Sequence, residues 1–229
     1  MISISFLPEI STACPDLQVL AMTCQVTNTV SNPLLWDEIA IEEQELRASC
    51  KLEEVNKWAP ILATRQAYKI LGKDPNRYRP SAESLRRRIL RGLSLYKIDT
   101  LVDIINLVSI HSGYSIGGFD ADKIVGSLTL GVGKEGELYH GIGRGELNIA
   151  GLPVYRDEVA GVGTPTSDEE RTKIELSTSS LLMIINGYSG MDGLLEAGRY
   201  SMDLFHKYAD VKEAEFALVN KEGQVNITI

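Results

Sequence analysis

The sequence predicts an α+β fold, with helices mostly in the first half of the chain and short strands in the second. In the first half, Leu35, Ile39, Leu46 and Leu52 recur at three- and four-residue steps or their multiples, which is typical of a helix. After residue 125, glycines recur between short apolar runs, which indicates strands joined by tight turns. No internal repeat or low-complexity linker divides the chain, so we expect a single domain over residues 1–229.

The expected elements follow from these patterns in chain order. In the first half we expect strands at 2–6 and 17–27, and helices at 34–57, 63–71, 81–90 and 99–112. Trp58-Ala59-Pro60 is expected to end the first helix, Ser81 to cap the third, and Gly72 and Gly113 to close two of them. In the second half we expect strands at 127–132 and 179–186, a helix at 191–208, and a hairpin of 215–219 and 225–229.

The charge of the chain bears on its partners. The net charge of −8 and the pI near 5.0 argue against an autonomous nucleic-acid binder, and we expect no DNA partner. Six arginines nevertheless fall between positions 77 and 91, and this stretch could contact RNA phosphates. The candidates for RNA contact are Arg77, Arg79, Arg86 and Arg87. The alternative is a solvated helix whose arginines form salt bridges with the acidic surface.

Targeting and metal signals do not appear in the sequence. No apolar run approaches the ~20 residues of a membrane span. The start alternates like a strand and carries no basic region before an apolar core, so we do not expect a signal peptide. Three cysteines without CxxC spacing and three scattered histidines predict reduced thiols and no metal site. We therefore expect a cytoplasmic protein with no membrane contact and no cofactor.

Several short motifs carry no distinctive chemistry. Residues 141–145 are rich in glycine, but no helical pattern follows them, so we interpret them as a turn rather than a phosphate loop. Asp99 with Asp103, and Asp168 with Arg171, have the spacing of solvated faces or helix-cap interactions. No serine occupies a nucleophile elbow. The residues alone therefore indicate an α+β domain with an arginine-rich helix start.

Three segments in fixed order resemble a known family. Residues 96–108 are similar to its proline-isoleucine-asparagine-serine-valine helix, and 117–124 to its histidine-alanine-phenylalanine-aspartate stretch. Residues 72–81 look like the hallmark of its free-standing branch, and its glycine-rich strand pair would fall at 160–164. The chain thus resembles a stand-alone B3/4 domain, the tRNA-binding and editing module of the phenylalanyl-tRNA synthetase beta chain. The resemblance is strongest over residues 61–187.

The resemblance implies a three-layer β/β/α fold with a cleft beside the helix that holds Asn106. The implied substrate-binding residues are Asn106, Ser109, Gly117, Gly118, Asp120, Gly161, Gly163 and Thr164. Glycines in the loop before Asp120 would let backbone approach an aminoacyl group closely. Two alternatives stay open: Gly117-Gly118 forms only a tight turn, and Asn106 is a buried amide that is satisfied within its helix.

The chain departs from the family where the editing chemistry lies. Gly117 stands at the family's histidine, Ile105 at its threonine, and Met183 or Ile184 near its glutamate. No acid lies between Glu175 and Asp192, so the catalytic residues are unknown. The remaining polar candidates are Asn106, Ser109, Asp120, Thr164, Thr166 and Thr172.

Two functions follow as hypotheses. The first is recognition of an aminoacyl group or of a tRNA acceptor end, with editing of mischarged tRNA in trans as the enzymatic form. The second is a non-catalytic module that binds a free amino acid or small metabolite. A third hypothesis is a protein–protein interaction domain that retains the family fold but not its activity. A class II catalytic core would not fit beside a domain of this size, so we do not expect a complete phenylalanine-tRNA ligase.

Overall fold

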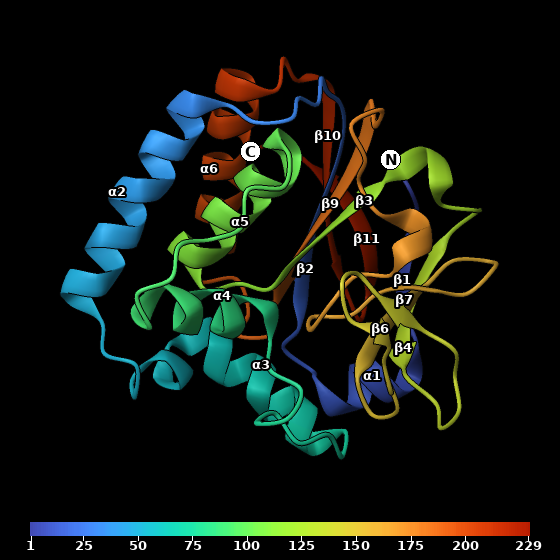
Figure 1. The fold of residues 1–229 in the computed structure, drawn as a ribbon. Helices are drawn as coiled ribbons and strands as arrows, with labels where there is room; N and C mark the ends of the chain where they lie inside the picture. The colour runs from blue at the N-terminus through green and yellow to red at the C-terminus, as the bar shows by residue number, and fades with distance from the viewer.

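The chain folds into three layers, which a computed structural model describes over residues 1–229. A five-stranded sheet forms the middle layer, helices cover one of its faces, and a four-stranded sheet covers the other (Figure 1). One large apolar cluster lies between the helices and the middle sheet, and a second lies between the two sheets. The predicted α+β class and β/β/α layering are confirmed.

The middle sheet is antiparallel throughout, in the order β11-β10-β2-β9-β3. Its strands are β2 Gln18–Gln25, β3 Ile116–Asp120, β9 Ser180–Gly187, β10 Lys212–Asn220 and β11 Gly223–Ile227. The predicted strands at 17–27 and 179–186 and the C-terminal hairpin are present. Strand β3 lies at one edge of the sheet, which becomes important for the site.

Strand β9 shows why the longest apolar run of the sequence belongs in this sheet. Leu181, Met183 and Ile185 face the helices, whereas Leu182 and Ile184 face the second sheet. All five side chains are fully buried. Because successive residues of a strand point to opposite faces, a strand covered on both sides must be apolar at every position.

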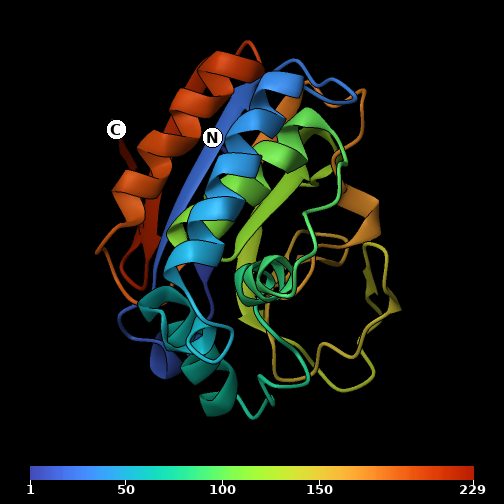
Figure 2. The same ribbon diagram turned by 60° about the vertical axis from the view of Figure 1, so that its left-hand side comes forward.

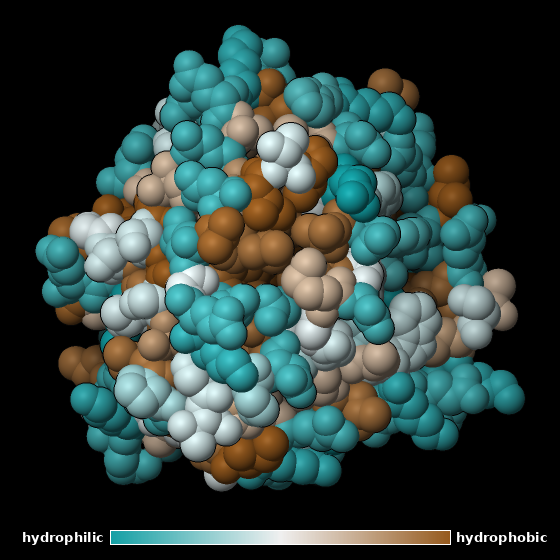
Figure 3. Space-filling model, turned by 180° about the vertical axis from the view of Figure 1, so that it is seen from behind, coloured by the Kyte–Doolittle hydropathy of each residue, from teal (hydrophilic) through white to brown (hydrophobic).

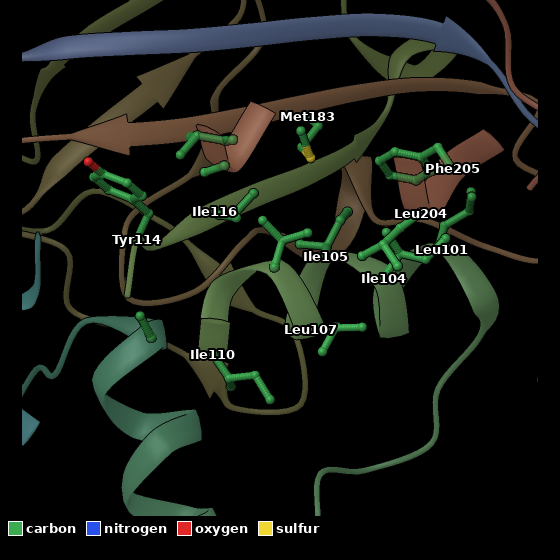
Figure 4. Close-up of a cluster of buried hydrophobic side chains, with 14 of the residues drawn as sticks. Leu101, Ile104, Ile105, Leu107, Ile110, Tyr114, Ile116, Met183, Leu204 and Phe205 are labelled. Carbon is green, nitrogen blue, oxygen red and sulfur yellow. The ribbon is translucent and has the colours of Figure 1, made fainter. Parts of the chain in front are cut away.

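The helical layer is centred on α5. Its helices are α2 Pro33–Ser49, α3 Ala59–Ile70, α4 Ser81–Leu90, α5 Thr100–Ser112 and α6 Leu194–Tyr208. Helices α2, α5 and α6 lie side by side over the sheet (Figure 2). Ile104 and Ile105 of α5 lie with Met183 of β9 and Phe205 of α6 in one apolar cluster (Figure 4). Asp99 caps α5 by accepting a hydrogen bond from the N–H of Val102, which confirms its expected cap role.

Three helix boundaries differ from those predicted. Helix α2 ends at Ser49, and a separate 3-10 turn, η1 Val55–Lys57, follows it. Pro60 lies in the first turn of α3, which begins at Ala59, rather than ending the preceding helix, because the first turn of a helix does not require the N–H that proline lacks. Ser81 is the first residue of α4 and not its cap: Pro80 occupies the cap, and the N–H of Ser81 donates to the carbonyl of Pro165 at 2.8 Å.

The second sheet has the order β1-β4-β7-β8. Its strands are β1 Ile4–Phe6, β4 Leu128–Val132, β7 Pro153–Arg156 and β8 Gly161–Gly163. A short helix that the sequence did not predict, α1 Pro8–Ala13, follows β1. The small hairpin of β5 His140–Gly141 and β6 Gly145–Glu146 confirms that residues 141–145 form a turn.

The surface carries both polar and apolar areas. Seen from behind, the molecule shows an apolar area near its centre, surrounded by hydrophilic side chains (Figure 3). None of the helices combines the length and apolar character that crossing a bilayer requires. The thiols of Cys14, Cys24 and Cys50 are all free.

Candidate functional site

A pocket of about 440 Å³ opens between helices α4 and α5 and the edge of strand β3. Most of its wall is apolar, and a few polar groups converge on it, as in typical ligand sites. The residues that line it are Ser81, Leu85, Ile98, Val102, Ile105, Asn106, Ser109, Ile116, Gly118, Ile142, Asp168, Lys173 and Ile174.

One face of α5 forms a wall of the pocket. Val102, Ile105, Asn106 and Ser109 follow the three- and four-residue spacing of a single helix face, and all four line the pocket. The Asn106 side chain is half-buried and makes no hydrogen bond within the protein, so the alternative of a satisfied buried amide is wrong. Ser109 differs, because its hydroxyl donates to the carbonyl of Tyr114 at 2.8 Å.

Strand β3 forms the facing wall. Gly117 and Gly118 lie inside this strand, so both the expected loop and the tight turn are wrong for these residues. A Cβ added at Gly118 would lie 2.5 Å from Cδ1 of Ile105 and 3.0 Å from Cδ1 of Ile174. Glycine therefore permits the close approach of α5 to the sheet edge at this point, and it brings the backbone of β3 to the pocket surface.

Asp168 presents a carboxylate to the pocket. Its Oδ2 accepts a hydrogen bond from the N–H of Gly118 at 3.1 Å. Its backbone forms an antiparallel bridge with Gly163, and its carbonyl accepts from the N–H of Ile142 at 3.0 Å. A Cβ at Gly117 or Gly163 would lie only 3.3 Å or 3.0 Å from Oδ1. Because Gly117 of β3 and Gly163 of β8 have no side chains, they leave the space that this carboxylate occupies.

The electrostatic setting of Asp168 is unusual. No lysine, arginine or histidine forms an ion pair with it. Burial in the apolar wall raises the pKa of the Asp168 carboxyl to about 7, and only the hydrogen bond from Gly118 opposes this effect. Asp168 and Arg171 form neither a solvated face nor a helix-cap interaction, the two alternatives for their spacing: Asp168 lines the pocket, and Arg171 binds Asp157 at 2.8 Å. A carboxyl with such a pKa can either hold a cation or exchange a proton near neutral pH.

Sequence reasoning did not select Asp168 as a site residue, although it lies only five residues after Gly163 of the glycine-rich segment. The aspartate follows the turn that leaves the glycine strand β8, and this turn returns the chain to the edge of β3. Thr164 holds the turn: its Oγ1 accepts hydrogen bonds from the N–H groups of Thr166 and Ser167, both at 3.1 Å. Thr164 itself is buried and does not line the pocket.

The other predicted pocket residues lie outside the lining. The carboxylate of Asp120 is buried, caps the N–H of Asp122 at 3.1 Å and accepts from the hydroxyl of Thr178 at 2.8 Å. A Cβ at Gly161 would lie 3.0 Å from the ring of Tyr139, so this glycine serves the packing of the second sheet. Of the remaining polar candidates, Thr166 shares a hydrogen bond of 2.9 Å with Tyr68. Thr172 is fully buried.

The four candidate arginines do not form one surface. Arg86 is fully buried, with its guanidinium 3.3 Å from the ring centroid of Trp58 and Nη2 donating to the carbonyl of His111. This burial corrects the expectation that Arg86 contacts phosphates. Arg87 donates to the buried carboxylate of Glu83 at 2.8 Å, as the salt-bridge alternative expects.

Arg77 and Arg79 are the exposed members of the group. They precede Ser81, which lines the pocket, by only four and two residues. The side chain of Arg79 is 43% exposed and 4.0 Å from Glu83, so a large part of it remains accessible to a partner.

In the structure, no acidic or basic side chain takes the place of the family's polar residues at Gly117, Ile105 and Met183. Gly117 faces the ring of Phe119 on the side of the second sheet. Met183 lies within the apolar cluster under α5 (Figure 4), and Ile105 is an apolar part of the pocket wall. The polar groups at this site are instead Ser81, Asn106, Ser109, Asp168 and Lys173.

Comparison with known proteins identifies the family. The family model described as the B3/4 domain matches residues 63–218, which is more than half of the chain. The phenylalanine--tRNA ligase beta subunit of Brucella abortus (strain 2308) is 33% identical over 110 residues, which cover 44% of this chain and 14% of that protein. The beta subunit of Bartonella henselae is 36% identical over 101 residues, covering 40% of this chain and 12% of that protein.

A solved structure agrees at the level of the fold. An N-terminal fragment of the phenylalanyl-tRNA synthetase beta subunit from Pyrococcus horikoshii superposes with a TM-score of 0.55 at 12% identity, over 99% of this chain and 54% of that one. The chain spans only a small part of the curated relatives it matches. The match over residues 63–218 places the chain in the B3/4 domain family.

Proposed function

We propose that this protein recognises the aminoacyl group at the acceptor end of a tRNA, and that the pocket between α5 and β3 holds the aminoacyl group. The observation that supports this most is the pocket itself, which is apolar for most of its wall and carries the Asn106 amide without a hydrogen bond and the Asp168 carboxylate without an ion pair. Its volume of about 440 Å³ lies within the ordinary range for small-ligand sites. Such a site suits the side chain of an apolar amino acid.

In this proposal the protein contacts only a small part of the RNA. With a net charge of −8, the chain has no broad basic face to follow an RNA backbone. Arg77 and Arg79 are exposed close in sequence to Ser81 of the pocket, and we propose that they contact the phosphates next to the bound aminoacyl group. The proposal carries with it a cytoplasmic location, where charged tRNA is used.

The proposal favours recognition over hydrolysis. Ester hydrolysis requires a positioned water and groups that polarise it. The family's histidine and glutamate positions are Gly117 and the apolar Met183–Ile184 stretch in this chain, so neither supplies such a group. Asp168 is the carboxylate that lines the pocket, and its single hydrogen bond to backbone gives it no second catalytic partner.

A binding assay with charged and uncharged tRNA tests the proposal. We expect the protein to bind tRNAs charged with apolar amino acids at least tenfold more tightly than the same tRNAs without an amino acid. Val102→Phe enlarges a side chain of the pocket wall and should remove this preference. Leu62→Phe, on the exposed side of α3 and outside the pocket, is the matched control and should keep it.

The arginine contact is tested separately. The double change Arg77→Gln and Arg79→Gln should weaken the binding of charged and uncharged tRNA alike, and should reduce its salt dependence. Arg199→Gln, a change of an exposed arginine on α6, should leave both unchanged.

Four results would contradict the proposal. Equal affinity for charged and uncharged tRNA would remove aminoacyl recognition. A preference for charged tRNA that survives Val102→Phe would show that the aminoacyl group binds elsewhere. Release of amino acid from any charged tRNA above the buffer blank would make the protein a deacylase rather than a binding module. Thermal shifts with free amino acids, in the absence of any tRNA binding, would favour a small-molecule module.

A further inference from the structure

We propose that Asp168 binds the ammonium group of the ligand, so that the pocket selects apolar aminoacyl esters and amides, which are cations, over zwitterionic free amino acids. This inference rests on the proposed function and deepens it by naming the charge state of the ligand. It assigns a role to a residue within the matched region that is not among the site residues that the family resemblance implies.

The geometry of Asp168 supports a ligand contact. The side chain lines the pocket, and Oδ2 is held by the N–H of Gly118 at 3.1 Å. This hydrogen bond fixes the orientation of the carboxylate without neutralising it. Gly117 and Gly163 leave room for Oδ1, since a Cβ at either position would lie within 3.3 Å of that atom. Oδ1 has no hydrogen-bond partner within the protein, so its lone pairs remain available to accept a hydrogen bond from a ligand donor.

The charges around the carboxylate favour a cation. Lys173 also lines the pocket, but its Nζ is held by Glu170 at 2.7 Å. Tyr139 donates its hydroxyl to the carbonyl of Ser167, and Glu169 accepts from the N–H of Arg171. No protein cation therefore neutralises Asp168. In an apolar wall, the attraction of an unpaired carboxylate for an ammonium group is stronger than in water.

The same argument distinguishes an ester from a free amino acid. In a free amino acid the α-carboxylate lies two bonds from the ammonium nitrogen, so it would approach Asp168 and repel it. An aminoacyl ester or amide has no such negative charge and presents only the ammonium group. Because Glu170 already holds Lys173, the pocket offers no free cation to balance a second carboxylate. The ligand that fits this charge pattern is an aminoacyl group joined to something else, as in charged tRNA.

Calorimetric titration with three small probes tests the inference. The probes are L-phenylalaninamide, which is a cation, L-phenylalanine, which is a zwitterion, and 3-phenylpropanamide, which lacks the amine. At about pH 7.5 somewhat more than half of α-amino groups with a pKa of about 7.7–8.0 are protonated. We expect the amide to bind at least tenfold more tightly than either of the other probes. Asp168→Asn should remove this tenfold preference and leave the weaker binding of 3-phenylpropanamide unchanged.

Glu169→Gln is the matched control, because it removes one carboxylate charge from the adjacent residue outside the pocket lining and should keep the preference. If 3-phenylpropanamide or L-phenylalanine binds wild-type protein as tightly as the amide does, the role of Asp168 is wrong, while the pocket remains an apolar site as proposed. If Asp168→Asn weakens all three probes equally, the residue only shapes the pocket, and the inference is likewise overturned. If none of the probes binds and charged tRNA does not bind more tightly than uncharged tRNA, both the inference and the proposed function are wrong.

Discussion

Replacing Asp168 by asparagine should stabilise the protein at pH 8 and leave its stability unchanged near pH 4. Asparagine has nearly the same shape and can still accept the hydrogen bond from Gly118, but it carries no charge. The pKa of the Asp168 carboxyl is raised from 3.8 to about 7 because the side chain is buried beside apolar groups. The folded protein therefore has to ionise an acid that its surroundings disfavour.

The magnitude follows from the pKa difference between the folded and unfolded states. At 1.36 kcal/mol per unit, the step from 3.8 to about 7 corresponds to about 4 kcal/mol as an upper bound. Because water reaches the half-buried side chain through the pocket, we expect about half of this, or about 2 kcal/mol. Between pH 4 and pH 7 the folded state binds more protons at this site than the unfolded state. The stability contributed by this group is thus highest below pH 4 and falls as the pH rises through 7.

Urea denaturation of both proteins at half-unit steps from pH 4 to pH 8 measures the effect. Asp168→Asn should gain about 2 kcal/mol over wild type by pH 8, which is a rise in Tm of roughly 4–8 °C for a chain of this size. A difference that stays constant with pH, or a wild type that is the more stable protein at pH 8, would refute the reasoning.

Asp157→Asn is a control for which we expect a change in stability of the opposite sign. Burial alone would raise the pKa of this carboxyl, but hydrogen bonds from Arg171 and from the backbone N–H groups of Val125, Val159 and Ala160 outweigh it and lower the pKa. The wild-type stability that this residue contributes is present above pH 4 and is lost as the pH falls further. Asp157→Asn should therefore destabilise the protein at pH 8, in contrast to the change at Asp168.

Three further predictions concern the frame around the site. Glu83→Gln should cost about 3 kcal/mol in urea denaturation, because it leaves the buried guanidinium of Arg65 without its carboxylate at 2.8 Å; an unchanged midpoint would contradict this. Gly133→Ala should lower the Tm by 5 °C or more, since its Cβ would lie 2.0 Å from the carbonyl oxygen of Ile149; equal melting curves would show that the backbone moves freely. Asn32→Ala should cost about 1 kcal/mol, because Asn32 caps the first N–H groups of α2, whereas Asn32→Ser should retain most of the stability.

Local patterns in the sequence were sufficient for much of the fold. The apolar run at 181–185 predicted a buried strand, because only a strand covered on both faces needs such a run. The predicted helix at 99–112 places Val102, Asn106 and Ser109 on one face, and in the structure this face is a pocket wall. These inferences held because periodicity depends on neighbours a few residues away in the chain.

Local patterns were less informative where one residue type serves two structures. Pro60 fits both the end of one helix and the first turn of the next, and the sequence alone favoured the wrong one. Gly117-Gly118 suits a loop as well as an edge strand, and the pairing with Met183 and Ile184 of β9 decided for the strand. Arg86 looks like a surface cation in the sequence, yet the Trp58 ring and the carbonyl of His111 hold it in the interior.

What the sequence by itself determined was the fold class, the resemblance to the B3/4 domain family, and the absence of any acid between Glu175 and Asp192. The tertiary structure alone decided which polar groups share a pocket. Asp168 is fifty residues from Gly118 in the chain, and only the turn after β8 brings its carboxylate to the edge of β3. The pKa of such a group depends on the apolar side chains and missing counter-charges around it, and these come from segments distant in sequence.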